Sequence, residues 1–203
     1  MPLLPLEPFL FPEDLLGSLM PGDGSDARWW VLHTRPRAEK SLARRLLSRE
    51  LPFFLPLHKR QWRSRGRLLC SHMPLFPGYI FLNGDNQARI AALETNLIAR
   101  CLPVEDQEQL HADLARVYHL IAAGEPLTPE DRLQAGSPVE IISGPLAGLE
   151  GKVIRRGKHL KFFVEVQFLQ QGVSVEIEGW MIQPLGDARP AVVGAESAGV
   201  VYR

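Results

Sequence analysis

The side chains capable of acid–base, nucleophilic or metal chemistry are scattered along this chain of 203 residues. Its six histidines show no metal-ligand spacing, and neither Cys70 nor Cys101 has a histidine partner that the sequence makes evident. No glycine-rich phosphate loop follows a predicted strand. The sequence therefore predicts no enzymatic activity, no metal site and no cofactor.

One stretch has side chains suited to binding a polyanion. Residues 28–67 contain twelve basic and two acidic residues, whereas residues 1–27 contain five acids and no Lys or Arg, and the formal net charge of the whole chain is zero. Within residues 58–67 the basic side chains surround one tryptophan: Lys59, Arg60, Trp62, Arg63, Arg65 and Arg67. Cations can contact phosphates while the indole stacks on an unpaired base. The alternative is a solvated hairpin whose charges only steer a partner.

The elements that must position this stretch can be predicted from residue periodicity. Residues 1–27 lack the basic start of a signal peptide, contain several prolines, and are expected to form a flexible extension rather than a membrane span. The alternative is that the hydrophobic beginning of this segment docks elsewhere. Residues 29–33 form a β-prone run, and residues 38–50 show the apolar spacing of an amphipathic helix. Residues 53–57 and 68–73 are predicted strands, joined by a basic arm that turns near residues 64–66.

The rest of the N-terminal half predicts a sheet with helices packed on it. A strand is expected at residues 79–82, a short helix at 87–95 and a strand at 97–102. A helix follows, with Leu110, Leu114 and Val117 at helical spacing. The order of elements favours an α+β class with a split βαβ, ferredoxin-like sheet over residues 28–123.

Residues 124–135 have the proline and charge content of an interdomain linker, and the chain after them is predicted to be all β. Short alternating strands separated by glycine turns over residues 136–186 indicate a small five-stranded, SH3-like β-barrel, followed by a tail at 187–203. The turn glycines Gly144, Gly148 and Gly151 would interrupt a helix, so a barrel is expected from the outset.

Two motifs identify a resemblance. Residues 74–82 read PLFPGYIFL, and residues 136–153 read GSPVEIISGPLAGLEGKV. The first resembles the F-P-G-Y strand of the NusG N-terminal (NGN) domain, and the second resembles the KOW motif of the same family. The run from Trp29 through Pro36 and the helix after it are similar to the family's opening, so the resemblance covers residues 28–185 in order.

The resemblance implies a bacterial transcription elongation and antitermination factor that binds RNA polymerase. It places the contact with the clamp helices of the largest polymerase subunit at Phe76, Pro77, Gly78 and Tyr79, with Trp30 beside them. For each aromatic residue of this set, packing in the core is the alternative. The basic arm would then face the non-template DNA of the transcription bubble, as in specialised, operon-specific (RfaH-like) paralogues of the family.

In the KOW unit the resemblance places partner contacts, with ribosomal protein S10 or Rho, at Leu149. Phe163 is a second candidate from the alternation of its strand, with burial under the linker as the alternative. Gly144, Gly148 and Gly151 are expected to serve turns and close packing. A ribosome-associated KOW protein that binds RNA remains the competing function. A cytoplasmic monomer is expected in either case.

Overall fold

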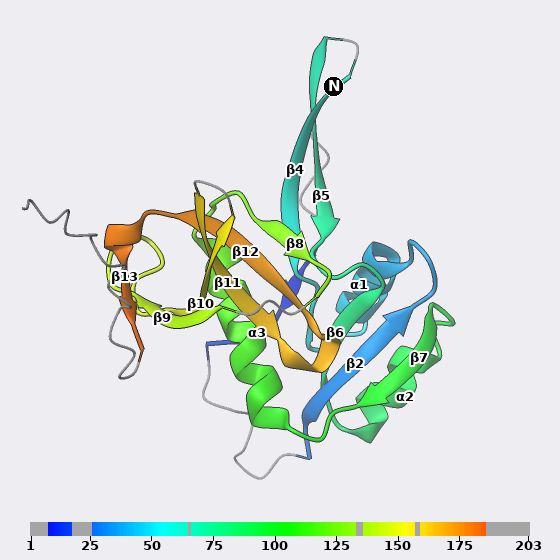
Figure 1. Cartoon of the computed structure of the whole chain (residues 1–203). Helices are drawn as coiled ribbons and strands as arrows, with labels where there is room; N and C mark the ends of the chain where they lie inside the picture. Colours follow the sequence, from blue (N-terminus) through cyan, green and yellow to red (C-terminus); the bar gives the residue numbers. More distant parts are fainter. Residues whose placement is uncertain (1–7, 18–25, 65, 133–135, 157–158, 186–203) are drawn as a thin grey trace, which may run out of the picture.

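The computed structural model describes residues 8–17, 26–64, 66–132, 136–156 and 159–185. In this part of the chain a five-stranded sheet carries helices on both faces, a two-stranded arm projects from it, and a six-stranded sheet follows (Figure 1). The mixed α and β content agrees with the predicted class. None of the helices described is long and apolar enough to cross a bilayer.

The five-stranded sheet is antiparallel throughout, in the order β1-β3-β6-β2-β7. Its strands are β1 (Leu10–Phe11), β2 (Arg28–Thr34), β3 (Phe53–Phe54), β6 (Tyr79–Gly84) and β7 (Ile98–Pro103). Alternate residues of a strand point to opposite faces, so Trp29 and Val31 pack on one side while Trp30 and Leu32 pack on the other. Both faces of β2 are therefore buried, which explains its unbroken apolar run.

Helices cover the two faces of this sheet. On one face lie α1 (Glu39–Leu47) and α2 (Asn86–Leu93), and on the other lies α3 (Gln107–Ala122). The carboxylates of Asp85 and Asp106 accept hydrogen bonds from backbone N–H groups in the first turns of α2 and α3. Such N-caps satisfy donors that have no partner inside a helix. The predicted helices are present, with ends shifted by a few residues.

The arm is a separate two-stranded sheet of β4 (Leu57–Ser64) and β5 (Arg67–Pro74). It stands out from the rest of the chain (Figure 1). The antiparallel register runs from the pair Leu57 and Pro74 at the root to the pair Ser64 and Arg67 at the tip. Gly66 at the turn has a φ of 75°, which glycine adopts without steric cost. The turn lies where the sequence predicted it.

Residues 8–17 do not form the flexible extension that was predicted. Strand β1 pairs with β3 at the edge of the sheet, and the backbone N–H of Leu55 donates a hydrogen bond of 2.6 Å to the carbonyl of Phe9. Leu16 is 6% exposed and lies in the same core as α3. The other apolar side chains of the segment, Phe9, Leu10, Phe11 and Leu15, are partly buried against the two cores of the sheet, which explains the difference. Residues 1–7 and 18–25 lie outside the described part of the chain.

The six-stranded sheet is also antiparallel, in the order β13-β9-β10-β11-β12-β8. Its strands are β8 (Thr128–Glu130), β9 (Ser137–Ile141), β10 (Glu150–Arg156), β11 (His159–Val166), β12 (Gln171–Ile177) and β13 (Ile182–Pro184). Strand β8 belongs to the predicted linker, but it pairs with β12, and the Ser174 hydroxyl donates a hydrogen bond of 2.7 Å to Glu130 Oε1. The linker therefore adds a sixth strand to the five predicted.

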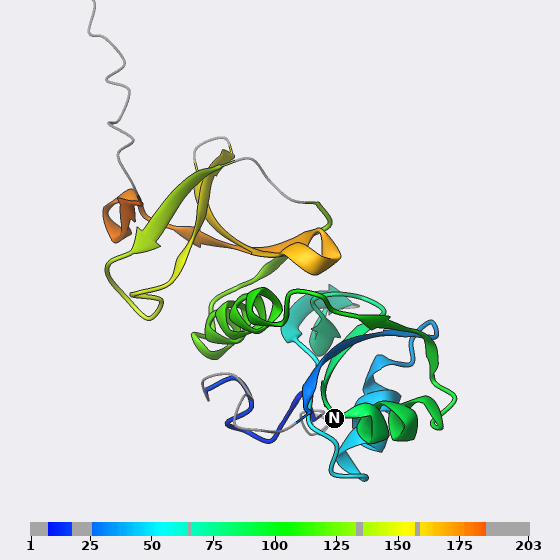
Figure 2. The ribbon, with the colours of Figure 1, turned by 90° about the horizontal axis from the view of Figure 1, so that it is seen from below.

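Helix α3 lies between the two large sheets (Figure 2). One hydrophobic core runs from the five-stranded sheet through Leu114 of α3 to Phe162 of β11. At its border the Asp113 carboxylate, fully buried, accepts a hydrogen bond of 2.9 Å from the backbone N–H of Gln167 in the turn η1 (Gln167–Leu169). Gln109 and Arg116 donate to the same carboxylate. Asp113 is thus the polar anchor between the two sheets.

Candidate nucleic-acid and protein interface

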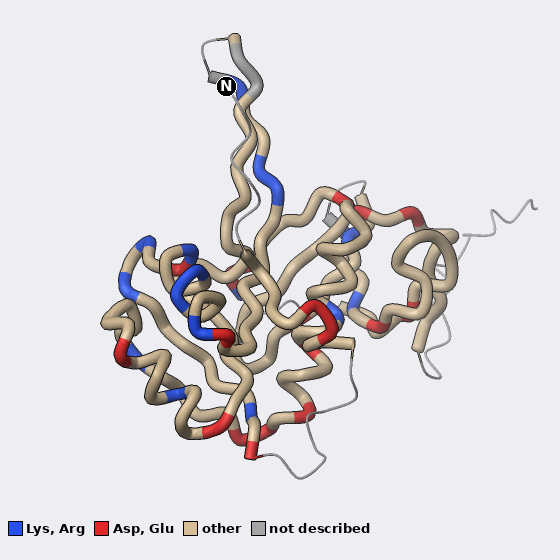
Figure 3. Tube along the Cα trace, turned by 180° about the vertical axis from the view of Figure 1, so that it is seen from behind, with Lys and Arg blue, Asp and Glu red and all other residues tan. Residues whose placement is uncertain are grey.

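The side chains of the arm divide into two faces. Side chains alternate between the two faces along each strand, and residues directly opposite one another in an antiparallel pair share a face. Lys59, Gln61 and Arg63 therefore lie on one face, and Arg60 and Trp62 lie on the other. All five are exposed. Lys and Arg positions follow the arm, whereas Asp and Glu are placed elsewhere on the trace (Figure 3). Arg65 and the side chain of Arg67, both predicted to bind nucleic acid, lie outside the described part.

The face that carries Trp62 is apolar as well as basic. Trp62 is 41% exposed, and its cross-strand neighbour Leu69 is 38% exposed. Met73 lies on the same face nearer the root of the arm and is 39% exposed. Arg60 is positioned along this face between Trp62 and Met73. An exposed indole beside a guanidinium can stack on an unpaired base while the cation contacts a phosphate. Of the side chains predicted to bind nucleic acid, this face presents Arg60 and Trp62, whereas Lys59 and Arg63 lie on the other face.

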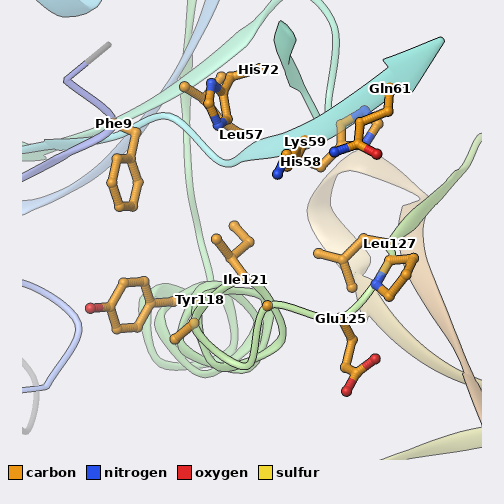
Figure 4. A pocket seen from close by; sticks show the side chains of 13 residues that line it. Phe9, Leu57, His58, Lys59, Gln61, His72, Tyr118, Ile121, Glu125 and Leu127 are labelled. Atoms are coloured by element: carbon orange, nitrogen blue, oxygen red, sulfur yellow. The ribbon is translucent and has the colours of Figure 1, made fainter. Parts of the chain in front are cut away.

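A groove of about 680 Å³ lies at the root of the arm (Figure 4). Tyr118 and Ile121 of α3 form one wall, and Phe9 closes one end. The opposite wall consists of residues from the Lys59 face of the arm, with Leu57 and His58 at its base. Three parts of the chain that are distant in the sequence, Phe9, the arm and residues 118–127, meet here, so periodicity alone could not predict the groove. The volume and the apolar floor are typical of binding sites.

His58 is the titratable group most affected by this groove. Burial lowers the pKa of its imidazole below the ordinary value of 6.5, and the charges of Arg60 and His72 act in the same direction. The fold therefore favours the neutral imidazole.

Stability is expected to depend on pH through His58. Since the folded state disfavours the protonated imidazole, the unfolded chain binds more protons once the pH falls through about 6.5. The free energy of unfolding should then decrease as the pH falls, until His58 is protonated in the fold too. His58→Gln should weaken this dependence and leave stability at pH 8 nearly unchanged, as measured by urea midpoints across the range. An identical pH profile for both proteins would contradict the assignment.

The residues predicted to bind polymerase do not form one surface. Pro77 is exposed, and Gly78, with a φ of 86°, donates its backbone N–H to Glu39 Oε1 at 2.8 Å. Tyr79 is half-buried, with its ring centroid 5.1 Å from that of His33. These three residues lie on one surface turn. The expectation of exposed anchors is wrong for Trp30 and Phe76.

Trp30 is 8% exposed and Phe76 is 1% exposed. They belong to the cores on opposite sides of the five-stranded sheet, which prevents them from sharing a patch. The Phe76 ring packs edge-on against Phe81, with centroids 6.3 Å apart. Trp30 Nε1 donates to the carbonyl of Gly84 at 3.1 Å, and the Arg28 guanidinium carbon lies 4.5 Å from the centroid of its ring. Both aromatic side chains are core residues, one on each face of the sheet.

The two candidates for partner binding in the C-terminal sheet are buried as well. Leu149 is 8% exposed and belongs to the core, and Phe163 is fully buried. Phe163 lines a small hollow with Arg116 of α3 and packs against Gly172, where an added Cβ would lie 2.4 Å from its ring. Buried in this way, neither Leu149 nor Phe163 presents its side chain to another protein.

The three glycines predicted to be structural have the geometry of turns and close approach. Gly144 has a φ of 87° and Gly148 a φ of 85°, in the left-handed region. A Cβ on Gly151 would lie 2.6 Å from Phe162 Cζ. Each position therefore disfavours any larger residue.

Among the described residues, no group of three His, Cys, Asp or Glu side chains could hold a metal ion. Both cysteines are free, and burial raises the pKa of the Cys101 thiol despite the opposing effect of Arg89. A thiol that stays protonated is a poor nucleophile.

Comparisons with known proteins identify the N-terminal part of the chain. Residues 27–117 match the sequence model of the NusG family, described as transcription termination factor nusG. No curated protein matches the chain. A chain from a solved structure described as "Crystal Structure of MjSpt4:Spt5 complex conformation B" aligns at 16% identity, over 77% of this chain and 96% of its own, with a TM-score of 0.25. So weak a superposition says nothing about function.

Proposed function

The chain belongs to the NusG family of transcription factors through its residues 27–117, and on this premise we propose that it binds RNA polymerase through an NGN domain at residues 28–123 and suppresses pausing or termination. The family consists of non-enzymatic factors, so the proposed mechanism is differential affinity. A factor that binds the elongating state more tightly than the paused state shifts the population toward elongation.

The observation that carries the proposal is the arm. It projects a cation-rich ribbon with an exposed indole, and its root borders a groove of about 680 Å³. A factor on the polymerase needs a protein contact and, next to it, a contact with the nucleic acid. We assign the polymerase contact to the turn of Pro77, Gly78 and Tyr79, and the contact with non-template DNA to the arm.

The C-terminal sheet is proposed to be a KOW unit over residues 136–186 that recruits a further partner, such as ribosomal protein S10 or Rho. The glycine turns and the antiparallel strands support this assignment. The competing function is a ribosome-associated protein whose KOW unit binds RNA. Co-sedimentation with ribosomes in place of polymerase would favour that alternative.

The arm gives a quantitative test of nucleic-acid binding. Each phosphate contact removed is expected to reduce the slope of log K against log salt by ~0.7–0.9. Arg60→Ala and Arg63→Ala should each produce such a change in binding to a DNA template with an open bubble, followed by fluorescence anisotropy at several salt concentrations. Arg100→Ala, an exposed arginine on β7, is the matched control. Slopes unchanged in both arm variants would exclude the arm from phosphate contact.

A further inference from the structure

The C-terminal sheet exposes two large apolar side chains on neighbouring segments. Trp180 is 69% exposed and Ile142 is 51% exposed, the two highest values for large apolar residues in the described chain. Trp180 lies in the turn η2 (Gly179–Met181), and Ile142 follows β9 directly. The backbone N–H of Ile142 donates a hydrogen bond of 2.8 Å to the carbonyl of Met181, so the two segments are adjacent. We call Ile142, Trp180 and Met181 the Trp180 surface.

The packing beneath this surface is fixed. Gly144 lies under Met181, because a Cβ at residue 144 would lie 2.9 Å from Met181 Cε. Met181 N–H also donates to the carbonyl of Glu178 at 3.0 Å, which closes the turn that presents Trp180. A single exposed apolar side chain needs no explanation, but two large ones on segments joined by a backbone hydrogen bond indicate an interaction site. Tryptophan is also the residue type most enriched in binding hot spots.

An acidic hollow of about 170 Å³ borders the Trp180 surface. Glu125, Glu176 and Glu178 line it, together with Met181, which it shares with the surface. Of its described lining residues none is Lys or Arg, and His159 lies 3.7 Å from Glu176. Lys161, the cross-strand neighbour of Glu176, does not line the hollow. The negative potential there disfavours phosphates and favours a cation.

We propose that the Trp180 surface and the acidic hollow together bind a basic segment of a partner protein, with an Arg or Lys side chain in the hollow and a neighbouring apolar side chain on Trp180. The proposal rests on the partner-binding role of the C-terminal sheet and is independent of polymerase binding. It also moves the expected partner contact away from Leu149 and Phe163, which are buried. The charge of this site is opposite to that of the arm, so the two sites select different partners.

The test uses the full chain and two short synthetic peptides, one of alternating leucine and arginine and one of alternating leucine and glutamate. Isothermal titration should give saturable binding of the arginine peptide. Trp180→Ala should weaken that binding by roughly thirty-fold, the effect of losing a hot-spot residue. Glu176→Gln with Glu178→Gln should weaken it and reduce its salt dependence. All three positions are exposed, so circular dichroism should remain that of the wild type.

Phe168→Ala is the matched control, since Phe168 is a large apolar residue, 37% exposed, in the turn η1 between β11 and β12. Its affinity for the arginine peptide should equal that of the wild type. Equal binding of the two peptides, or full binding by Trp180→Ala, would overturn the proposal. So would self-association of the chain that Trp180→Ala abolishes, because a second copy would then be the occupant. Failure of polymerase binding alone would leave this inference intact.

Discussion

Replacing Asp113 with alanine should lower the free energy of unfolding by about 3 kcal/mol, because a buried carboxylate that joins the two sheets would be lost. The change removes the acceptor of the Gln167 backbone N–H and leaves Gln109 and Arg116 without the group to which they donate. Arg116 is 31% exposed, so water can compensate that side chain in part. Urea denaturation followed by circular dichroism measures the effect.

Glu108→Ala is the control for Asp113→Ala, since Glu108 is an exposed acid on the same helix. Its effect should stay within about 0.5 kcal/mol, as for most surface substitutions. Asp113→Asn keeps one carbonyl acceptor and should fall between the two. Equal midpoints for Asp113→Ala and Glu108→Ala would show that the contact between the sheets contributes little to stability.

Phe76→Ala should destabilise the fold by about 3–5 kcal/mol, the usual cost of emptying a buried aromatic site. Phe76 is 1% exposed and packs against Phe81, so the substitution leaves a cavity under the five-stranded sheet. Any loss of polymerase binding by this variant would therefore reflect unfolding. Thermal denaturation decides the matter: a variant as stable as the wild type that fails to bind polymerase would restore Phe76 as a surface anchor.

The sequence predicted what depends on local pattern. The β-prone run of residues 29–33, the apolar stripe of α1 and the glycine turns of the C-terminal sheet lead directly to the elements observed. The two-stranded arm and its turn could also be predicted, because two β-prone segments joined by a short basic stretch indicate a β-hairpin.

What could not be predicted depends on contacts between distant segments. The family resemblance placed Phe76 and Trp30 in a contact with polymerase, but the sheet is buried on both faces and each of the two side chains packs in one of its two cores. Asp113 and Gln167 are 54 residues apart, and no local feature pairs them. Residues 10–11 pair with the edge strand β3, so part of the predicted flexible extension is a strand of the sheet. The exposure of Trp180 likewise follows from the placement of η2.

Copurification with core RNA polymerase tests the central claim most directly. Immobilised wild-type chain should retain the polymerase, and Pro77→Glu, which places a charge on the exposed turn without touching the core, should weaken retention at least roughly tenfold. Trp180→Ala should retain the polymerase as the wild type does. If the folded wild-type chain retains no polymerase but sediments with ribosomes, the proposed function is wrong.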